Sequence, residues 1–163
     1  MEIVSPEDLK NIFYSGFDVA PAWQVLDELT MAIHNQAVEY FVLPVCSVSD
    51  YHTICESIHN IEGLGPQQKG HMALKKIAQG WLQSQYGCDA LFESYFVGLH
   101  PDVCSKDYRL VMECGTTDPS CVTIYLDNES VSWAGNISYP YYGESDIRLH
   151  GFRRGLNYRS WRQ

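Results

Sequence analysis

The chain has 163 residues, of which 45% are hydrophobic, so it is long enough for one domain with a sizeable core and too short to expect two. No apolar run approaches the roughly 20 residues that a membrane span needs, and we expect no membrane partner. Residues 1–17 lack the basic and apolar regions of a signal peptide, so a cytoplasmic location is expected. The net charge of −9 argues against broad binding of duplex nucleic acid, which normally needs a basic face.

The cysteines carry no metal or redox motif. There are six of them, at irregular spacings and without a Cys-x-x-Cys pair. We therefore expect reduced thiols that are mostly buried.

Residues 1–63 are expected to form a mainly helical N-terminal extension. Ser5 and Pro6 have the pattern of a helix start, and further helices are predicted after Pro21 and after Ser49. The segment 40–43 is strand-like, and Pro44 is expected to break it.

The following segment predicts an α/β core in the order helix, three strands, helix, strand. An amphipathic helix is predicted over 67–86, a strand over 90–97, a hairpin after that, a short helix over 119–126 and a last strand over 130–139. We expect these strands to form a mixed sheet of about four strands.

The hairpin between Pro101 and Thr117 carries the most informative residues. In the strand from Tyr108 to Cys114, side chains alternate, so Glu113 lies on the face opposite to the more apolar one. The hairpin turn brings Asp102, at the start of its first strand, towards Glu113. Two carboxylates at one sheet edge outline a site for a hard cation.

The order of elements and the two acids resemble the PD-(D/E)XK nuclease superfamily, which has the restriction-endonuclease-like fold. Pro101-Asp102 is similar to its first acidic motif and Glu113-Cys114-Gly115 to its second, in a branch with Glu-Cys-Gly in place of Glu-x-Lys. The resemblance covers about residues 67–142. It implies that Asp102, Glu113 and the carbonyl of Cys114 are ligands of magnesium or manganese, and it shows glycine where the family has its lysine.

Other residues are candidates for the roles that this site leaves open. Lys75 could replace the missing lysine, although a helix lysine more often lies along the surface. His71, four residues before Lys75, is a candidate base or a structural histidine. Glu93 is a candidate additional ligand, although an exposed cross-strand partner is the favoured interpretation. The thiol of Cys114 is not expected to act as a nucleophile, because buried thiols are usually inert.

The C-terminal segment is basic. Five of the eleven Lys and Arg residues lie after Asp146, and no acidic residue follows them. A basic tail over 147–163 could contact nucleic acid through Arg153 and Arg154, or it could dock on the acidic body of the protein.

These observations predict a single domain over 1–163 with a helical extension (1–63), a nuclease-like core (64–146) and a basic tail (147–163). The expected function is metal-dependent hydrolysis of phosphodiester bonds in DNA or RNA. The alternative is a catalytically inactive module of the same fold that binds nucleic acid or protein. A homodimer and membership of a larger complex both stay open.

Overall fold

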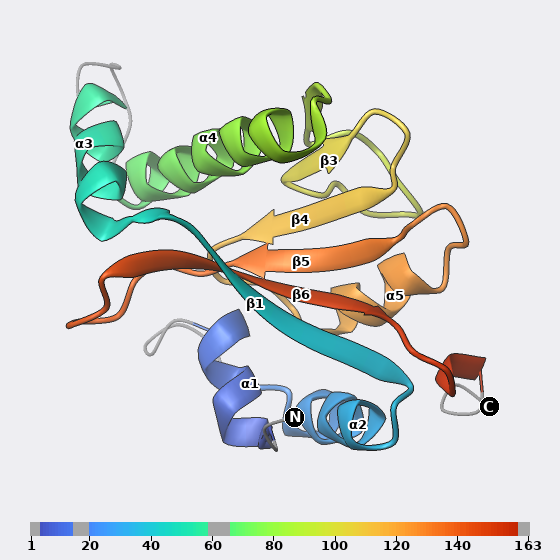
Figure 1. The fold of residues 1–163 in the computed structure, drawn as a ribbon. Coiled ribbons are helices and arrows are strands. Elements are labelled where there is room, and N and C mark those ends of the chain that lie inside the picture. The colour runs from blue at the N-terminus through green and yellow to red at the C-terminus, as the bar shows by residue number, and fades with distance from the viewer. Residues whose placement is uncertain (1–3, 15–19, 59–65, 160–163) are drawn as a thin grey trace.

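The computed structural model describes residues 4–14, 20–58 and 66–159. It is a mixed α/β protein with a six-stranded sheet in the order β1-β6-β5-β4-β3-β2 (Figure 1). Only β4 and β5 pair in parallel, and the other neighbours are antiparallel. The elements are α1 (Pro6–Phe13), α2 (Trp23–His34), β1 (Val38–Ser47), α3 (Val48–Ile58), α4 (Pro66–Tyr86), β2 (Ala90–Phe92), β3 (Val103–Ser105), β4 (Leu110–Cys114), α5 (Ser120–Leu126), β5 (Trp133–Ile137) and β6 (Asp146–Arg154).

The order of elements predicted for the central segment is confirmed. From α4 to β5 the chain forms a helix, three strands, a helix and a strand. The strand predicted over 90–97 is much shorter, because it ends at Phe92 and Glu93 has a left-handed backbone with φ of 50°. A separate pair of hydrogen bonds joins Phe96 to Leu99 beyond it.

The N-terminal segment is not only helical. The three predicted helices are present, and the first has the expected cap, in which Ser5 and Asp8 bond reciprocally. However, β1 is a ten-residue strand that forms one edge of the sheet. It continues through Pro44, where the register with β6 shifts. Proline is tolerated there because an edge strand has an unpaired side.

The first part of the segment predicted as a basic tail is not a tail but a strand. Residues 146–154 form β6, which lies inside the sheet between β1 and β5. Arg153 pairs with Glu39 on β1 and lies over the ring of Phe41. Arg154 donates to the carbonyls of Leu126, at 2.6 Å, and Val131, at 2.8 Å. The docking alternative therefore describes these two arginines, while Trp161 and Arg162 lie outside the described residues.

Replacing Arg154 with alanine is expected to lower the free energy of unfolding by about 3 kcal/mol, because it leaves part-buried carbonyls without a charged donor. Urea denaturation checks this value. Arg153→Ala is the matched control, with an expected loss below about 1 kcal/mol, because its ion pair is half exposed. Equal losses in the two variants would contradict these different roles.

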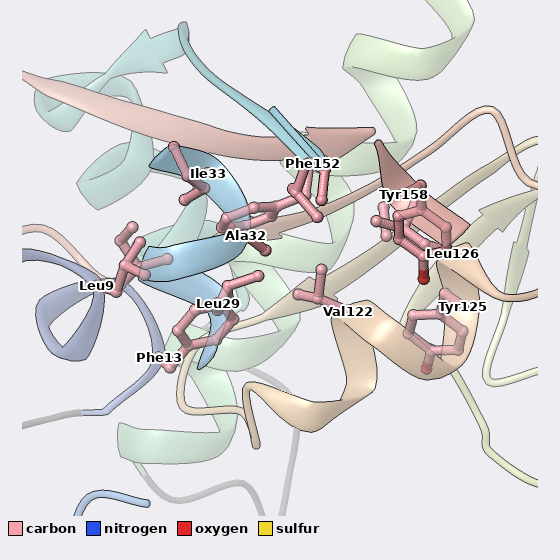
Figure 2. Close-up of a cluster of buried hydrophobic side chains, with 14 of the residues drawn as sticks. Leu9, Phe13, Leu29, Ala32, Ile33, Val122, Tyr125, Leu126, Phe152 and Tyr158 are labelled. Carbon is pink, nitrogen blue, oxygen red and sulfur yellow. The ribbon is translucent and has the colours of Figure 1, made fainter. Parts of the chain in front are cut away.

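The sheet separates two hydrophobic clusters. The first lies under α1, α2 and α5, where Phe13 stacks on Phe152 and Leu29, Ile33 and Val122 fill the space around them (Figure 2). The second lies under α3 and α4. In β4, Val111 belongs to the first cluster, whereas Leu110 and Met112 belong to the second, so the predicted alternation of that strand is confirmed.

All six cysteines are free thiols. Only Cys104 and Cys114 are buried and the other four are half-buried, so the expectation that most of them are buried is wrong. No helix within the described parts of the chain combines the length and the apolar character that crossing a membrane requires.

Candidate acidic site

The hairpin of β3 and β4 places Asp102 opposite Glu113. Val103 pairs with Met112 and Cys104 with Val111, so the next pair outward along the ladder is Asp102 and Glu113. Burial and, after it, the negative charge of Asp102 raise the pKa of Glu113, so the two carboxyl groups lie close enough to interact electrostatically. The ladder makes these two residues neighbours at the open end of the hairpin, as the sequence predicted, and the site that they would form stays a prediction.

Asp102 is held on both of its oxygens. His71 Nε2 lies 3.2 Å from Oδ1, and the backbone N–H of Cys114 donates to Oδ2 at 2.8 Å. Burial alone would raise the pKa of Asp102, but the hydrogen bonds from His71 and Cys114 outweigh it, and the pKa is lowered. Asp102 is therefore ionised although it is only 9% exposed.

Glu113, in contrast to Asp102, has a raised pKa. Its Oε1 accepts a hydrogen bond from the Tyr125 hydroxyl at 2.5 Å. Burial and the negative charge of Asp102 raise the pKa of Glu113 to about 8. At neutral pH the pair thus carries about one negative charge rather than two, because two close carboxylates in a buried site repel each other.

Of the two candidate residues on α4, His71 contacts the acidic pair and Lys75 does not. His71 contacts Asp102, and the hydrogen bond to that carboxylate raises the pKa of the imidazole. Lys75 instead lies 3.6 Å from Glu93 and 5.4 Å from the ring centre of Phe92. The positive charge of Lys75 is therefore balanced by Glu93 and not by Asp102 or Glu113.

Glu93 is exposed, as the favoured interpretation had it, but it lies beyond the end of β2 and its partner is on helix α4 and not on a neighbouring strand. Its side chain is 62% exposed and pairs with Lys75. Its contact with Asp102 is made by the backbone: the N–H of Glu93 donates to the carbonyl of Asp102 at 3.3 Å.

Cys114 contributes its backbone to the site. Its side chain is buried in the cluster under α4, and burial raises the pKa of the thiol well above its usual range. A thiol in that environment stays protonated and is a poor nucleophile. Its N–H positions Asp102, as described above.

The backbone at position 115 does not accommodate the lysine side chain of the family pattern. Its φ is 79°, and a Cβ atom built on it would lie 2.6 Å from the ring of Tyr139. The Tyr139 ring therefore fills the space where a side chain at position 115 would begin.

Sequence reasoning missed the roles of Tyr125 and Tyr139. Tyr125 follows Val122 by three positions on the face of α5 that packs on the sheet, which is the one signal that could have indicated it. The approach of Tyr139 to Gly115 is a tertiary contact that no local sequence pattern specifies.

The donors present fit a magnesium or manganese ion better than a zinc ion. No group of three or more His, Cys, Asp or Glu side chains within the described ranges is arranged to hold a metal. Magnesium, however, commonly uses one or two carboxylates and keeps several waters. Asp102 and Glu113, with the neighbouring carbonyl of Cys114, provide such a set, and a divalent cation would relieve the repulsion that raises the Glu113 pKa.

Two cavities lie elsewhere on the protein. One, of about 180 Å³, is lined by Tyr40, Tyr139 and His150, and the other, of about 470 Å³, by Tyr86, Arg109 and Trp133. Neither is lined by Asp102 or Glu113.

Comparisons with protein-family models, with curated proteins and with solved structures found no match to this chain.

Proposed function

We propose that Asp102 and Glu113 form the divalent-metal site of a phosphodiester hydrolase with a core of the PD-(D/E)XK type. The observation that carries this proposal is the meeting of the two carboxyl groups at the end of the β3–β4 hairpin, with the Glu113 pKa raised to about 8 by burial and by Asp102. A buried pair of this kind is costly without a counter-charge, and such arrangements concentrate at functional sites.

The residues of the site divide into holding and proton-transfer roles. Asp102, Glu113 and the carbonyl of Cys114 would hold the ion. The bound ion would polarise the phosphate and lower the pKa of a water molecule. His71 is the proton carrier that the fold brings to the pair, and its Nε2 faces the carboxylate oxygen at 3.2 Å. Tyr125 fixes the orientation of Glu113 through its hydroxyl.

A non-catalytic module is the second candidate, and two observations favour it. The position of the usual lysine is Gly115, closed by Tyr139, and Lys75 is paired with Glu93. In addition, Arg153 and Arg154 are engaged within the fold and do not form a basic face.

The deciding experiment is a titration with magnesium and manganese, followed by a cleavage assay on single- and double-stranded DNA and RNA. We expect metal-dependent cleavage that is lost in Asp102→Ala. His71→Ala should reduce the rate by about 10² to 10⁴-fold, the usual size of a proton-transfer contribution. Lys75→Ala is the matched control on the same helix, and we expect it to stay near the wild-type rate because its partner is Glu93.

Three outcomes separate the alternatives. Cleavage that persists in Asp102→Ala would exclude this site as its source. Nucleic-acid binding without metal uptake or cleavage would favour the non-catalytic module. A large loss in Lys75→Ala with none in His71→Ala would reverse the roles assigned to these two residues.

Metal affinity should depend on pH through Glu113. The ion must displace a proton from this carboxyl group, so affinity should rise about tenfold per pH unit as pH approaches the pKa of about 8, and level off above it. Loss of the proton from His71 acts in the same direction, because it frees Asp102. Calorimetric titration with manganese across this range checks the dependence, and an affinity independent of pH would contradict it.

A further inference from the structure

The larger cavity lies at the other end of β4 from the acidic pair. It has a volume of about 470 Å³ and lies between the end of α4, at Tyr86, and the turn that joins β3 to β4. Leu110, the first residue of β4, forms part of its lining, whereas Glu113 lies near the end of the same strand. This volume is in the range of sites that hold small molecules.

Two aromatic rings, Tyr86 and Trp133, line the cavity, and Phe41 and Trp81 support them from behind. Trp133 lies 5.9 Å from both Phe41 and Trp81, and Trp81 lies 5.6 Å from Tyr86, all between ring centres and at steep interplanar angles. Trp133 is 7% exposed and Tyr86 is 52% exposed, so the wall runs from the core to the surface. Such a wall is an ordered surface for another flat ring.

Two basic side chains and one acidic side chain also line the cavity, namely Lys106, Arg109 and Asp107. Arg109 donates to the Ser132 hydroxyl at 3.4 Å, and it makes no salt bridge to any residue in the described ranges. Lys106 pairs with Asp89 at 3.6 Å, but both side chains are about 70% exposed, so solvent screens this pair. Hydrogen bonds from the Ser105 hydroxyl, at 2.7 Å, and from the backbone N–H of Arg109, at 3.1 Å, lower the pKa of the Asp107 carboxyl group, and the charge of Arg109 acts in the same direction.

These features fix an orientation for a ligand. The C-terminal end of α4 beside Tyr86 has a partial negative charge and disfavours an anion there. An anionic group would therefore lie towards Arg109 and Lys106, and an apolar ring towards Tyr86 and Trp133. We propose that this cavity binds a planar aromatic molecule that carries one anionic group. The site is separate from the acidic pair, and the proposal does not depend on hydrolase activity.

The test uses naphthalene-2-sulfonate and its uncharged analogue 2-naphthol, titrated into the full chain without divalent metal and followed by calorimetry. We expect the sulfonate to bind at one site and more tightly than the naphthol. Arg109→Ala should weaken sulfonate binding by roughly tenfold or more, the effect of one charge-assisted hydrogen bond, and leave naphthol binding nearly unchanged. Tyr86→Ala should weaken both ligands, because it removes part of the aromatic wall.

Two controls keep this proposal distinct from the proposed function. Glu113→Gln should leave sulfonate binding unchanged, because the acidic pair is at the other end of β4. Arg148→Ala removes a positive charge outside the cavity, where Arg148 pairs with Glu144, and should also have no effect. Absence of saturable binding, or sulfonate binding that Arg109→Ala and Arg148→Ala weaken equally, would overturn the assignment.

Discussion

Glu113→Gln is expected to abolish metal binding and, at the same time, to stabilise the protein at alkaline pH. In the wild-type protein the folded-state pKa is raised from 4.5 to about 8, so between these values the folded state holds a proton that the unfolded state has released. Wild-type stability must therefore fall as pH rises through this window. The loss should be on the order of 5 kcal/mol, since the shift from 4.5 to about 8 is roughly 3.5 pKa units and each unit corresponds to about 1.4 kcal/mol.

The glutamine variant lacks the ionisable group and should lose this part of the pH dependence. Its amide oxygen can still accept the hydrogen bond from Tyr125, so the packing around position 113 is retained. Thermal unfolding at several pH values between about 5 and 9 measures the effect. Glu93→Gln is the matched control and should follow the wild-type curve, because that side chain is 62% exposed. If Glu113→Gln also follows the wild-type curve, Glu113 is not protonated at neutral pH.

Gly115→Lys is expected to destabilise the fold and not to restore a catalytic lysine. A side chain at φ of 79° is strained by about 1–2 kcal/mol, and its Cβ would lie 2.6 Å from Tyr139. Overpacking of this kind adds about 1–3 kcal/mol, so the total loss should be about 3 kcal/mol. Urea denaturation checks the stability, and the cleavage assay checks the activity.

The contribution of Tyr139 can be separated from backbone strain. Gly143 has a similar φ of 88° and nothing within 4 Å of its Cβ position, so Gly143→Ala should show the strain alone. Gly115→Ala should be clearly more destabilising than Gly143→Ala. Adding Tyr139→Ala to Gly115→Lys should recover part of the loss. Equal losses in the two glycine variants would mean that the Tyr139 ring moves aside at little cost.

The acidic site was predictable because its geometry is local. A short turn and the alternation of side chains along β4 are enough to bring Asp102 opposite Glu113. The ion pair of Lys75 with Glu93 was harder to predict from the sequence. It depends on the early end of β2, where Glu93 has a left-handed backbone. The contact of Tyr139 with Gly115 joins residues that follow two different strands, β5 and β4, and has no local signal.

The placement of the C-terminal arginines shows a different limit of sequence reasoning. A run of positive charge describes a solvated tail and a strand docked on an acidic body equally well. What decided between them was the pairing of Arg153 with Glu39, across more than a hundred residues of sequence. The same long-range pairing explains why β1, predicted as a short isolated segment, is a sheet strand.

The insertion of β6 between β1 and β5 also has a consequence for synthesis. Val38 pairs with Arg154 and Ile137 with Leu149, so β1 and β5 both lack this neighbour until residues 146–154 have left the ribosome. A nascent chain that stops short of them presents two open strand edges, one of them ten residues long. Such edges are the usual starting points of aggregation, so we expect the chain to be most prone to aggregation between translation of β1 and translation of β6.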